Sequence, residues 1–147
     1  MMSTPAPEIS IEAQNFNWLL SRFTHDTGGV IAAIAVSSDG LLIATSTALD
    51  RANADRLAAI SSAIVSLAHG ASECYPLGPP DKVVVELAEG FLLVCTISAG
   101  CLVGVLASNL TSLGTIAYET VLFIDRAKAV LTPLLVEELK RTVGAAC

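Results

Sequence analysis

The stretch DRANADRLAAISSAIVSLAHGAS (residues 50–72) decides the fold, because its apolar side chains recur at helical spacing. Five of them follow one another at intervals of three or four residues: Leu57, Ile60, Ile64, Leu67 and Ala71. That spacing stacks side chains on one side of a helix, so we predict a long helix that buries this face on the body of the domain. Asp50 is the predicted N-cap, because its carboxylate can accept the free amide hydrogens of the first turn.

The opposite face of this helix carries small side chains and a few charges where a solvated helix would carry Lys and Glu. Its members are Arg51, Asp55, Ala58, Ser62, Val65, Ser66 and His69. Small side chains let a second helix approach closely, and most soluble oligomers are closed twofold dimers, so we expect a helix-mediated dimer. The alternative is a weakly polar exposed face that is rich in good helix formers.

Composition limits the classes of protein. A chain of 147 residues with 53% apolar and 15% charged residues is expected to form one domain with a sizeable core. Eight basic and 14 acidic residues give a net charge of −6, and basic residues do not cluster with aromatic ones. We therefore expect no nucleic-acid partner and no binding to anionic membranes.

The N-terminal residues MMSTPAPEIS contain neither a basic nor a hydrophobic segment. We predict a flexible tail over residues 1–10, one domain over residues 11–143 and a second flexible tail over residues 144–147. Without a visible secretory signal, the expected location is the cytoplasm, where partners could hold the protein at a membrane.

No charged residue lies between Glu89 and Glu119, which is long enough to suggest a membrane span. Strand-forming residues and the turn Ser98-Ala99-Gly100 favour two short strands instead. Together with residues 82–87, these strands form a predicted antiparallel meander. A hairpin is predicted around Asp39-Gly40, with a first strand at residues 30–36 that is apolar on both faces and therefore needs helices on both sides of the sheet.

Helices complete the predicted order. A short first helix has its apolar face marked by Phe16, and Trp18 lies off that face, where it packs on a neighbouring helix or serves as an exposed anchor for a partner. A long helix from about residue 111 ends near Thr132, which caps a last helix through Arg141 that has Pro133 in its first position. The expected arrangement has the first and last helices on one face of the sheet and the helix at residues 50–72 on the other.

Catalytic and metal chemistry find little support in the residues. His25-Asp26 lacks a nucleophile elbow, and His69 with Cys74 supplies only two of the ligands that zinc needs. No phosphate-binding loop is present in the sequence, and the four cysteines form no CxxC pair. We predict no catalytic residue, no metal and no cofactor, with reduced thiols; a disulfide between Cys95 and Cys101 across their shared turn is the minority alternative.

Five segments of the chain resemble the roadblock/LC7 domain family. They are FNWLLSRF, AVSSDGLLIATS, DRLAAISSAIVSLAHGAS, LGTIAYETVLFIDR and LTPLL, and they are spread over most of the chain, from residue 16 to residue 135. The likeness is closest to the actinobacterial members that are encoded with a small Ras-like GTPase and a sensor histidine kinase. It implies a three-layer α/β/α fold of the roadblock/LC7 (profilin-like) type, with a five-stranded antiparallel sheet.

The resemblance also implies a homodimer formed by the second helix and the adjacent edge strand. On this sequence the dimer seam maps to Ala58, Ser62, Val65 and His69, and the edge pairing maps to Val83 and Val85. Such pairing would cover an apolar sheet edge that is otherwise prone to aggregation.

The partner implied by the resemblance is a small Ras-like GTPase, in a complex that can include a sensor histidine kinase. The candidate partner-binding residues are Arg51, Asp55, Arg56 and Ser66. The favoured function is a non-enzymatic adaptor, in which the charges on the rim select the partner. One alternative is acceleration of GTP hydrolysis, for which Arg51 or Arg56 would be the candidate arginine. Another alternative is a small-molecule sensor, although polar groups do not visibly converge.

Overall fold

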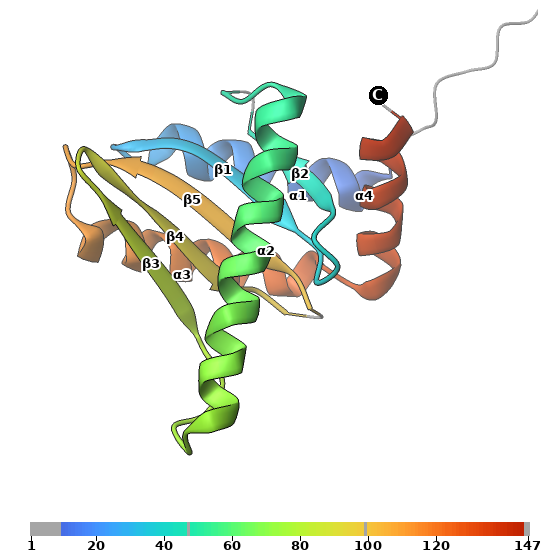
Figure 1. Cartoon of the computed structure of the whole chain (residues 1–147). Helices are drawn as coiled ribbons and strands as arrows, with labels where there is room; N and C mark the ends of the chain where they lie inside the picture. The colour runs from blue at the N-terminus through green and yellow to red at the C-terminus, as the bar shows by residue number, and fades with distance from the viewer. Residues whose placement is uncertain (1–9, 47, 99, 146–147) are drawn as a thin grey trace, which may run out of the picture.

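A five-stranded antiparallel sheet forms the centre of the protein in the computed structural model, which describes residues 10–46, 48–98 and 100–145 (Figure 1). Its strands are β1 (Val30–Val36), β2 (Leu42–Thr45), β3 (Lys82–Leu87), β4 (Gly90–Thr96) and β5 (Leu102–Ser108). They lie in the order β2-β1-β5-β4-β3, and every neighbouring pair is antiparallel.

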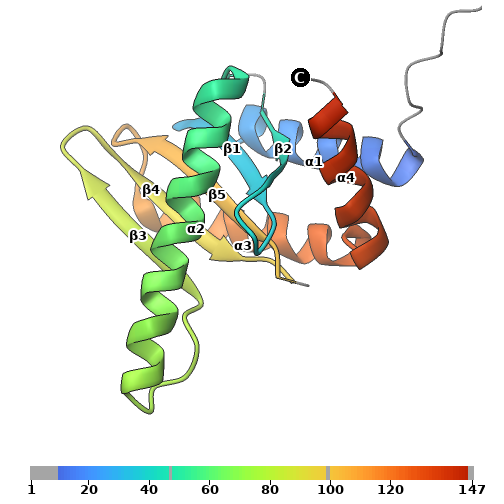
Figure 2. The same cartoon turned by 45° about the vertical axis from the view of Figure 1, so that its right-hand side comes forward.

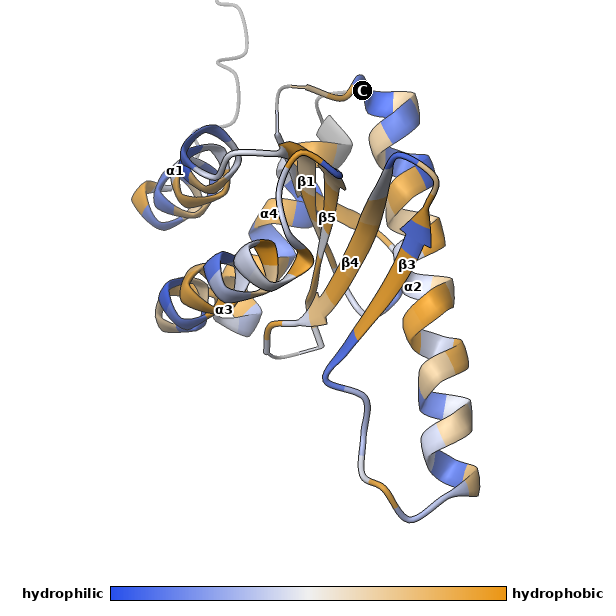
Figure 3. Cartoon of the chain, turned by 90° about the vertical axis from the view of Figure 1, so that its left-hand side faces the viewer, coloured by the Kyte–Doolittle hydropathy of each residue, from blue (hydrophilic) through white to orange (hydrophobic). Residues whose placement is uncertain are grey.

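Helices cover both faces of the sheet, as predicted. The helices are α1 (Ile11–Asp26), α2 (Arg51–Cys74), α3 (Leu113–Val130) and α4 (Pro133–Ala145). Figure 3 shows the sheet standing between α1 and α3 on one side and α2 on the other. Helix α4 lies beside β2 and contacts α1 (Figure 2), so it covers the edge of the sheet that β2 forms. The three-layer α/β/α class is therefore confirmed.

Each face of the sheet has its own core. On the side of α1 and α3, the largest fully buried side chains include Phe16, Leu20 and Ile116, which pack against the alternate residues of β4 and β5. On the side of α2, Ile34 and Val94 of the sheet pack against small residues of the helix. Strand β1 contributes to both cores, because residues 32–36 are all buried. This explains why its sequence is apolar without alternation.

Local signals in the sequence fix the ends of the elements. Asp50 caps α2 by accepting a hydrogen bond from the Asn53 amide at 2.8 Å, and Thr132 caps α4 through the Leu135 amide at 3.1 Å. Gly40, with φ of 83°, closes the turn between β1 and β2. A positive φ is the conformation that glycine adopts at little cost, so the predicted hairpin is confirmed.

Two boundaries differ from the prediction. Ser10 is the N-cap of α1 and also hydrogen-bonds Glu138, so it belongs to the domain rather than to a tail. Helix α4 continues to Ala145 rather than ending at Arg141. As predicted, the stretch between Glu89 and Glu119 forms two strands, β4 and β5, followed by the start of α3, rather than a membrane-spanning helix. The rest of the predicted tails, residues 1–9 and 146–147, lies outside the described residues.

Candidate interface on helix α2 and strand β3

Helix α2 packs mostly small side chains against the sheet. Its buried residues are Ala54, Leu57, Ala58, Ser61 and Val65. The helix can come this close because β5 has a glycine, Gly104, beneath it: a Cβ there would lie 2.8 Å from the Ser61 hydroxyl oxygen. The small residues Ala54, Ala58 and Ser61 suit this close approach, and Leu57 and Val65 are the larger side chains of the buried face.

The prediction of which face is buried is therefore wrong for most of α2. Leu57 is buried as expected and Ile64 is half-buried, but Ile60 is 44% exposed and Leu67 is 77% exposed, and Ala71 is exposed as well. Ile60 and Leu67 point away from the closely packed side of the helix, which carries Ala54, Ala58 and Ser61.

The predicted dimer seam is corrected for the same reason. Ala58 is 1% exposed and Val65 is 8% exposed, so both are covered by the sheet of their own domain. Ser62 is half-buried near the β1–β2 turn, where a Cβ on Gly40 would lie 3.5 Å from its hydroxyl oxygen. Of the four predicted seam residues, only His69 is exposed.

A different stripe of α2 faces outward. Its exposed members are spaced alternately by four and three residues: Arg56, Ile60, Ala63, Leu67, Gly70 and Cys74. This is the spacing with which two helices pack along a common seam. Ala63 and Gly70 between the bulky residues leave space for the ridge of a second helix. We name these six residues the outer stripe.

Helix α2 is 24 residues long and its C-terminal end extends beyond the sheet (Figure 1). In the described part of the chain it is also the one helix that is long and apolar enough, by length and composition alone, to cross a membrane, with 22% of that stretch buried. A helix that packs one side on a sheet and exposes an apolar stripe on the other passes the same test of length and composition. We therefore interpret its apolar surface as a protein interface.

Strand β3 borders α2 at the edge of the sheet. Among the described residues it pairs only with β4, so its outer backbone groups face away from the sheet. Val83, Val84 and Val85 are all half-buried. Val85 packs on the α2 side of the sheet and Val84 on the opposite side, so alternation places Val83 with Val85. The predicted pairing residues thus lie on an apolar edge strand.

Two shallow hollows lie along α2. One, of about 210 Å³, is lined by Arg56 and Ile60 of the helix together with Leu49 and Leu106. The other, of about 140 Å³, brings together Ser62, Ser66 and His69, which the sequence had placed on one face. Ser66 and Arg56, both predicted to bind a partner, are exposed but belong to different hollows.

The other two predicted partner-binding residues are engaged within the domain. Arg51 Nε donates to both carboxylate oxygens of Asp55 at 3.0 Å, and Arg51 Nη1 donates to the Val143 carbonyl of α4 at 2.6 Å. Arg51 therefore holds the start of α2 to the end of α4. An arginine fixed in this way is a structural link between helices, which sequence reasoning did not foresee.

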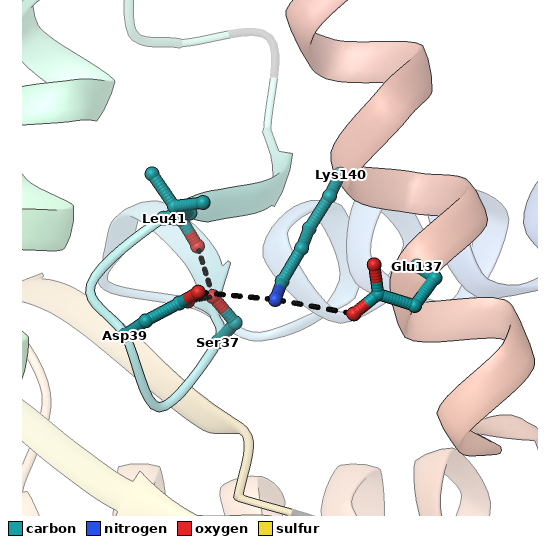
Figure 4. Close-up of polar contacts among 5 residues, drawn as sticks. All are labelled: Ser37, Asp39, Leu41, Glu137 and Lys140. Carbon is teal, nitrogen blue, oxygen red and sulfur yellow. Dashed lines mark hydrogen bonds and ion pairs between the residues drawn. The ribbon is translucent and has the colours of Figure 1, made fainter.

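Helix α4 is also tied to the β1–β2 turn (Figure 4). Lys140 Nζ lies 3.2 Å from Asp39 Oδ2 and 3.4 Å from Glu137 Oε1. Ser37 donates its hydroxyl hydrogen to Asp39, and this hydrogen bond is the main cause that lowers the pKa of the Asp39 carboxyl, with Lys140 adding to it. The hydrogen bond to Asp39 raises the pKa of Lys140 in turn.

A third tie joins α4 to α1. Ser10 donates from its amide and its hydroxyl to the Glu138 carboxylate at 3.0 and 2.8 Å. These hydrogen bonds, the hydroxyl first, lower the pKa of Glu138. Helix α4 is thus anchored by polar contacts to α1, to the β1–β2 turn and to α2, around the apolar contacts of Leu135 and Leu139 with the core.

Within the described residues, no three His, Cys, Asp or Glu side chains are grouped to hold a metal ion. Cys95 and Cys101 are both buried and are not joined to each other, and Cys74 is exposed at the end of α2. Burial raises the pKa of the Cys95 thiol to about 11, so this thiol is neutral at pH 7.

Comparison with known proteins supports the fold. A Roadblock/LC7 domain from Streptomyces avermitilis is 29% identical, and the match covers 77% of this chain and 94% of that one with a TM-score of 0.73. Myxococcus xanthus MglB is 19% identical, with 79% and 94% covered and a TM-score of 0.73. Schizosaccharomyces pombe profilin is 13% identical, with 80% and 99% covered and a TM-score of 0.60. No curated protein was found to match the chain.

The family follows from the sequence match. The Roadblock/LC7 domain model matches residues 16–113, which is more than half of the chain and runs from α1 to the start of α3. The matched region contains α2 and all five strands of the sheet, including the edge strand β3. The similarity in fold to profilin agrees with the predicted profilin-like class. The chain belongs to the Roadblock/LC7 domain family.

Proposed function

We propose that the protein is a non-enzymatic homodimeric adaptor or regulator that binds a small Ras-like GTPase in a signalling complex. The observation that carries this proposal is the outer stripe of α2 beside the apolar edge strand β3, in a Roadblock/LC7 domain. Domains of this family are expected to be platforms for Ras-like GTPases rather than enzymes. A cytoplasmic location, with a sensor histidine kinase in the same complex, belongs to the same proposal.

In the proposed dimer, the outer stripes of two copies face each other and their β3 strands lie side by side. Ile60 and Leu67 are the central apolar residues of this contact, and Val83 and Val85 line the paired strands. Two α2 helices would then form one continuous surface for the GTPase. Arg56, whose exposed guanidinium has no hydrogen bond or ion pair within the described residues, lies at the end of the stripe. It is the charged residue best placed to contact the partner.

Stimulation of GTP hydrolysis is the second candidate function. Of its two candidate arginines, Arg51 and Arg56, the geometry favours Arg56. Arg51 is held by Asp55 and the Val143 carbonyl, so it would have to leave two partners before it reached a nucleotide. Arg56 is not held in this way. A small-molecule sensor is disfavoured at α2, because the two hollows along this helix, of about 140 and 210 Å³, are smaller than the roughly 300 Å³ of typical ligand sites.

The test uses the small Ras-like GTPase encoded nearest to the gene of this protein, loaded with GDP or with a GTP analogue. Co-elution in either state with unchanged GTP turnover supports the adaptor, and co-elution with faster turnover supports the regulator of hydrolysis. Arg56→Ala should weaken co-elution if Arg56 only binds, or abolish the faster turnover with binding retained if it acts in hydrolysis. Arg141→Ala, at an exposed arginine of α4 outside the outer stripe and β3, is the matched control. Absence of association in both states would overturn the proposal.

A further inference from the structure

The face of the sheet opposite α2 carries a second feature with the properties of a binding surface. A groove of about 280 Å³ runs between α1 and α3, and Leu19, Leu122 and Phe123 are among its apolar lining residues, together with charged side chains of both helices. Figure 3 shows that α1 and α3 lie on the other side of the sheet from α2. A partner in this groove would therefore leave the outer stripe of α2 accessible.

Trp18 forms an exposed aromatic wall of the groove. Its side chain is 56% exposed, and the Arg22 guanidinium lies 5.0 Å from the centre of its ring. Arg22 is held in turn by Asp26, with 2.9 Å between Nε and Oδ2. The indole is thus supported by a braced cation, which lowers the conformational entropy that a partner must remove when it binds. Trp and Arg are also the residues that most often dominate the energy of protein interfaces.

Two charged residues of α3, Glu119 and Arg126, follow each other along the groove. A Cβ on Gly29 would overlap the side chain of Thr111, so the end of α1 meets the start of α3 and the two helices run antiparallel. On α3, Glu119 lies in the half nearer to that meeting point and Arg126 lies two turns further along. Neither side chain has a hydrogen bond or an ion pair within the described residues. Seven residues correspond to about 10 Å along a helix.

An occupant must match this pattern. Opposite charges two helical turns apart, with apolar lining residues and an aromatic wall between them, fit a helix that carries one basic and one acidic residue seven positions apart. Its apolar residues, three and four positions from each charge, would contact Trp18 and Leu122. An extended peptide would find no open strand edge here, and a nucleic acid would meet Glu119 and Asp26 as well as the arginines.

We propose that the groove between α1 and α3 is a second docking surface, which receives an amphipathic helix of a partner protein with a basic residue opposite Glu119, an acidic residue opposite Arg126 and large apolar side chains between them. This site lies apart from the proposed GTPase surface. It gives the protein two faces with which to join two different partners.

The chain offers a direct probe, because Trp18 is its single tryptophan. Two alanine-based helical peptides serve as ligands, each with Glu and Arg seven positions apart and two Leu between them. The positions of Glu and Arg are exchanged between the two peptides, so that both directions of binding are covered. The expected result is a shift of Trp18 emission to shorter wavelength with one of the peptides. Arg126→Glu should weaken this binding about tenfold or more, whereas Lys128→Glu, the same charge change on α3 outside the groove, should not.

A charge-swap variant completes the test. The double variant Glu119→Arg/Arg126→Glu should prefer the peptide whose charges are the reverse of those that the natural protein prefers. The inference is overturned if neither peptide shifts the emission at millimolar concentration, or if Arg126→Glu and Lys128→Glu weaken binding equally. Dimer mass and GTPase co-elution report on the α2 side of the sheet. A lack of peptide binding at the groove between α1 and α3 is therefore distinguishable from failure of the proposed function.

Discussion

Ser61 of α2 occupies the space that a side chain at Gly104 of β5 would need, since a Cβ there would lie 2.8 Å from the Ser61 hydroxyl oxygen and 3.3 Å from Ile34 Cγ1. The glycine thus lets the helix lie close to the sheet at this point. The buried side of the helix is mostly small, with Ala54, Ala58 and Ser61 beside Leu57 and Val65.

Gly104→Ala should therefore destabilise the fold by about 1–3 kcal/mol, the usual cost of adding a methyl group to a packed core. The change is measured as a lower midpoint of urea unfolding. Gly114→Ala on α3 is the matched control, because a Cβ there meets nothing within 4 Å. Alanine is the better helix former, so that variant should be unchanged or slightly more stable. Equal effects of the two substitutions would contradict the close contact.

Leu67→Asp should convert the proposed dimer into a folded monomer. Leu67 is 77% exposed in the single chain, so a charge there costs little in the monomer but would be buried between two copies. Light scattering gives the mass, and circular dichroism checks the fold. Leu134→Asp on α4, at a residue that is 84% exposed, is the control and should leave the mass unchanged. A dimer that persists in Leu67→Asp would place the interface elsewhere.

Val65→Asp should instead unfold the domain, because Val65 is buried against the sheet of its own chain. An unpaired carboxylate in that core costs several kcal/mol, so the far-ultraviolet spectrum should lose its helical signal or the urea midpoint should fall sharply. A soluble, folded Val65→Asp monomer would show that Val65 faces a partner, as the sequence pattern had suggested.

Helix α4 should loosen in acid. The pKa values of the Asp39 and Glu138 carboxyls are lowered in the folded state. Their contribution to the stability of the fold is therefore complete above the pKa of free carboxyls, about 4. It is lost as the pH falls through the lower pKa values of the folded state. Lys140, whose pKa is raised, stays charged throughout this range. Hydrogen exchange of α4, corrected for intrinsic rates, should rise between pH 5 and pH 2 more than that of α3. Asp39→Asn should reduce this difference.

Cysteine labelling should separate exposed from buried thiols. Iodoacetamide at pH 8 should modify Cys74 rapidly and Cys95 slowly, because Cys95 is buried and its pKa is raised to about 11. Mass spectrometry of the peptides at successive times gives the two rates. Unfolding the protein in urea should make the labelling rates of Cys74 and Cys95 similar. Rapid labelling of Cys95 in the folded protein would contradict its burial.

Much of the fold could be predicted because its signals are local. Asp50 and Thr132 are capping residues, Asp39-Gly40 is a hairpin turn, and an apolar first strand requires cover on both faces. The Roadblock/LC7 resemblance, carried by segments such as AVSSDGLLIATS, was confirmed by the family match over residues 16–113. The order of the strands in the sheet was obtained from the structure.

The faces of α2 could not be predicted, because periodicity shows which residues share a side but not which side is buried. The helix has two apolar sides, and hydrophobicity alone predicts that the bulkier one, which contains Ile60 and Leu67, faces the core. The missing information lay in another element, at Gly104, since a glycine inside a strand indicates a close approach by a neighbour. The roles of Arg51 and Lys140 depend on contacts with residues about 90 and 100 positions away, which no local pattern contains.

The two edges of the sheet differ in one respect that limits how copies can assemble. The β2 edge lies under α4, whereas β3 pairs only with β4 among the described residues. A chain with two open edges could add further copies at each end and grow into a fibre. Here a pair joined through β3 uses the open edge of both members, so edge-to-edge growth stops at two.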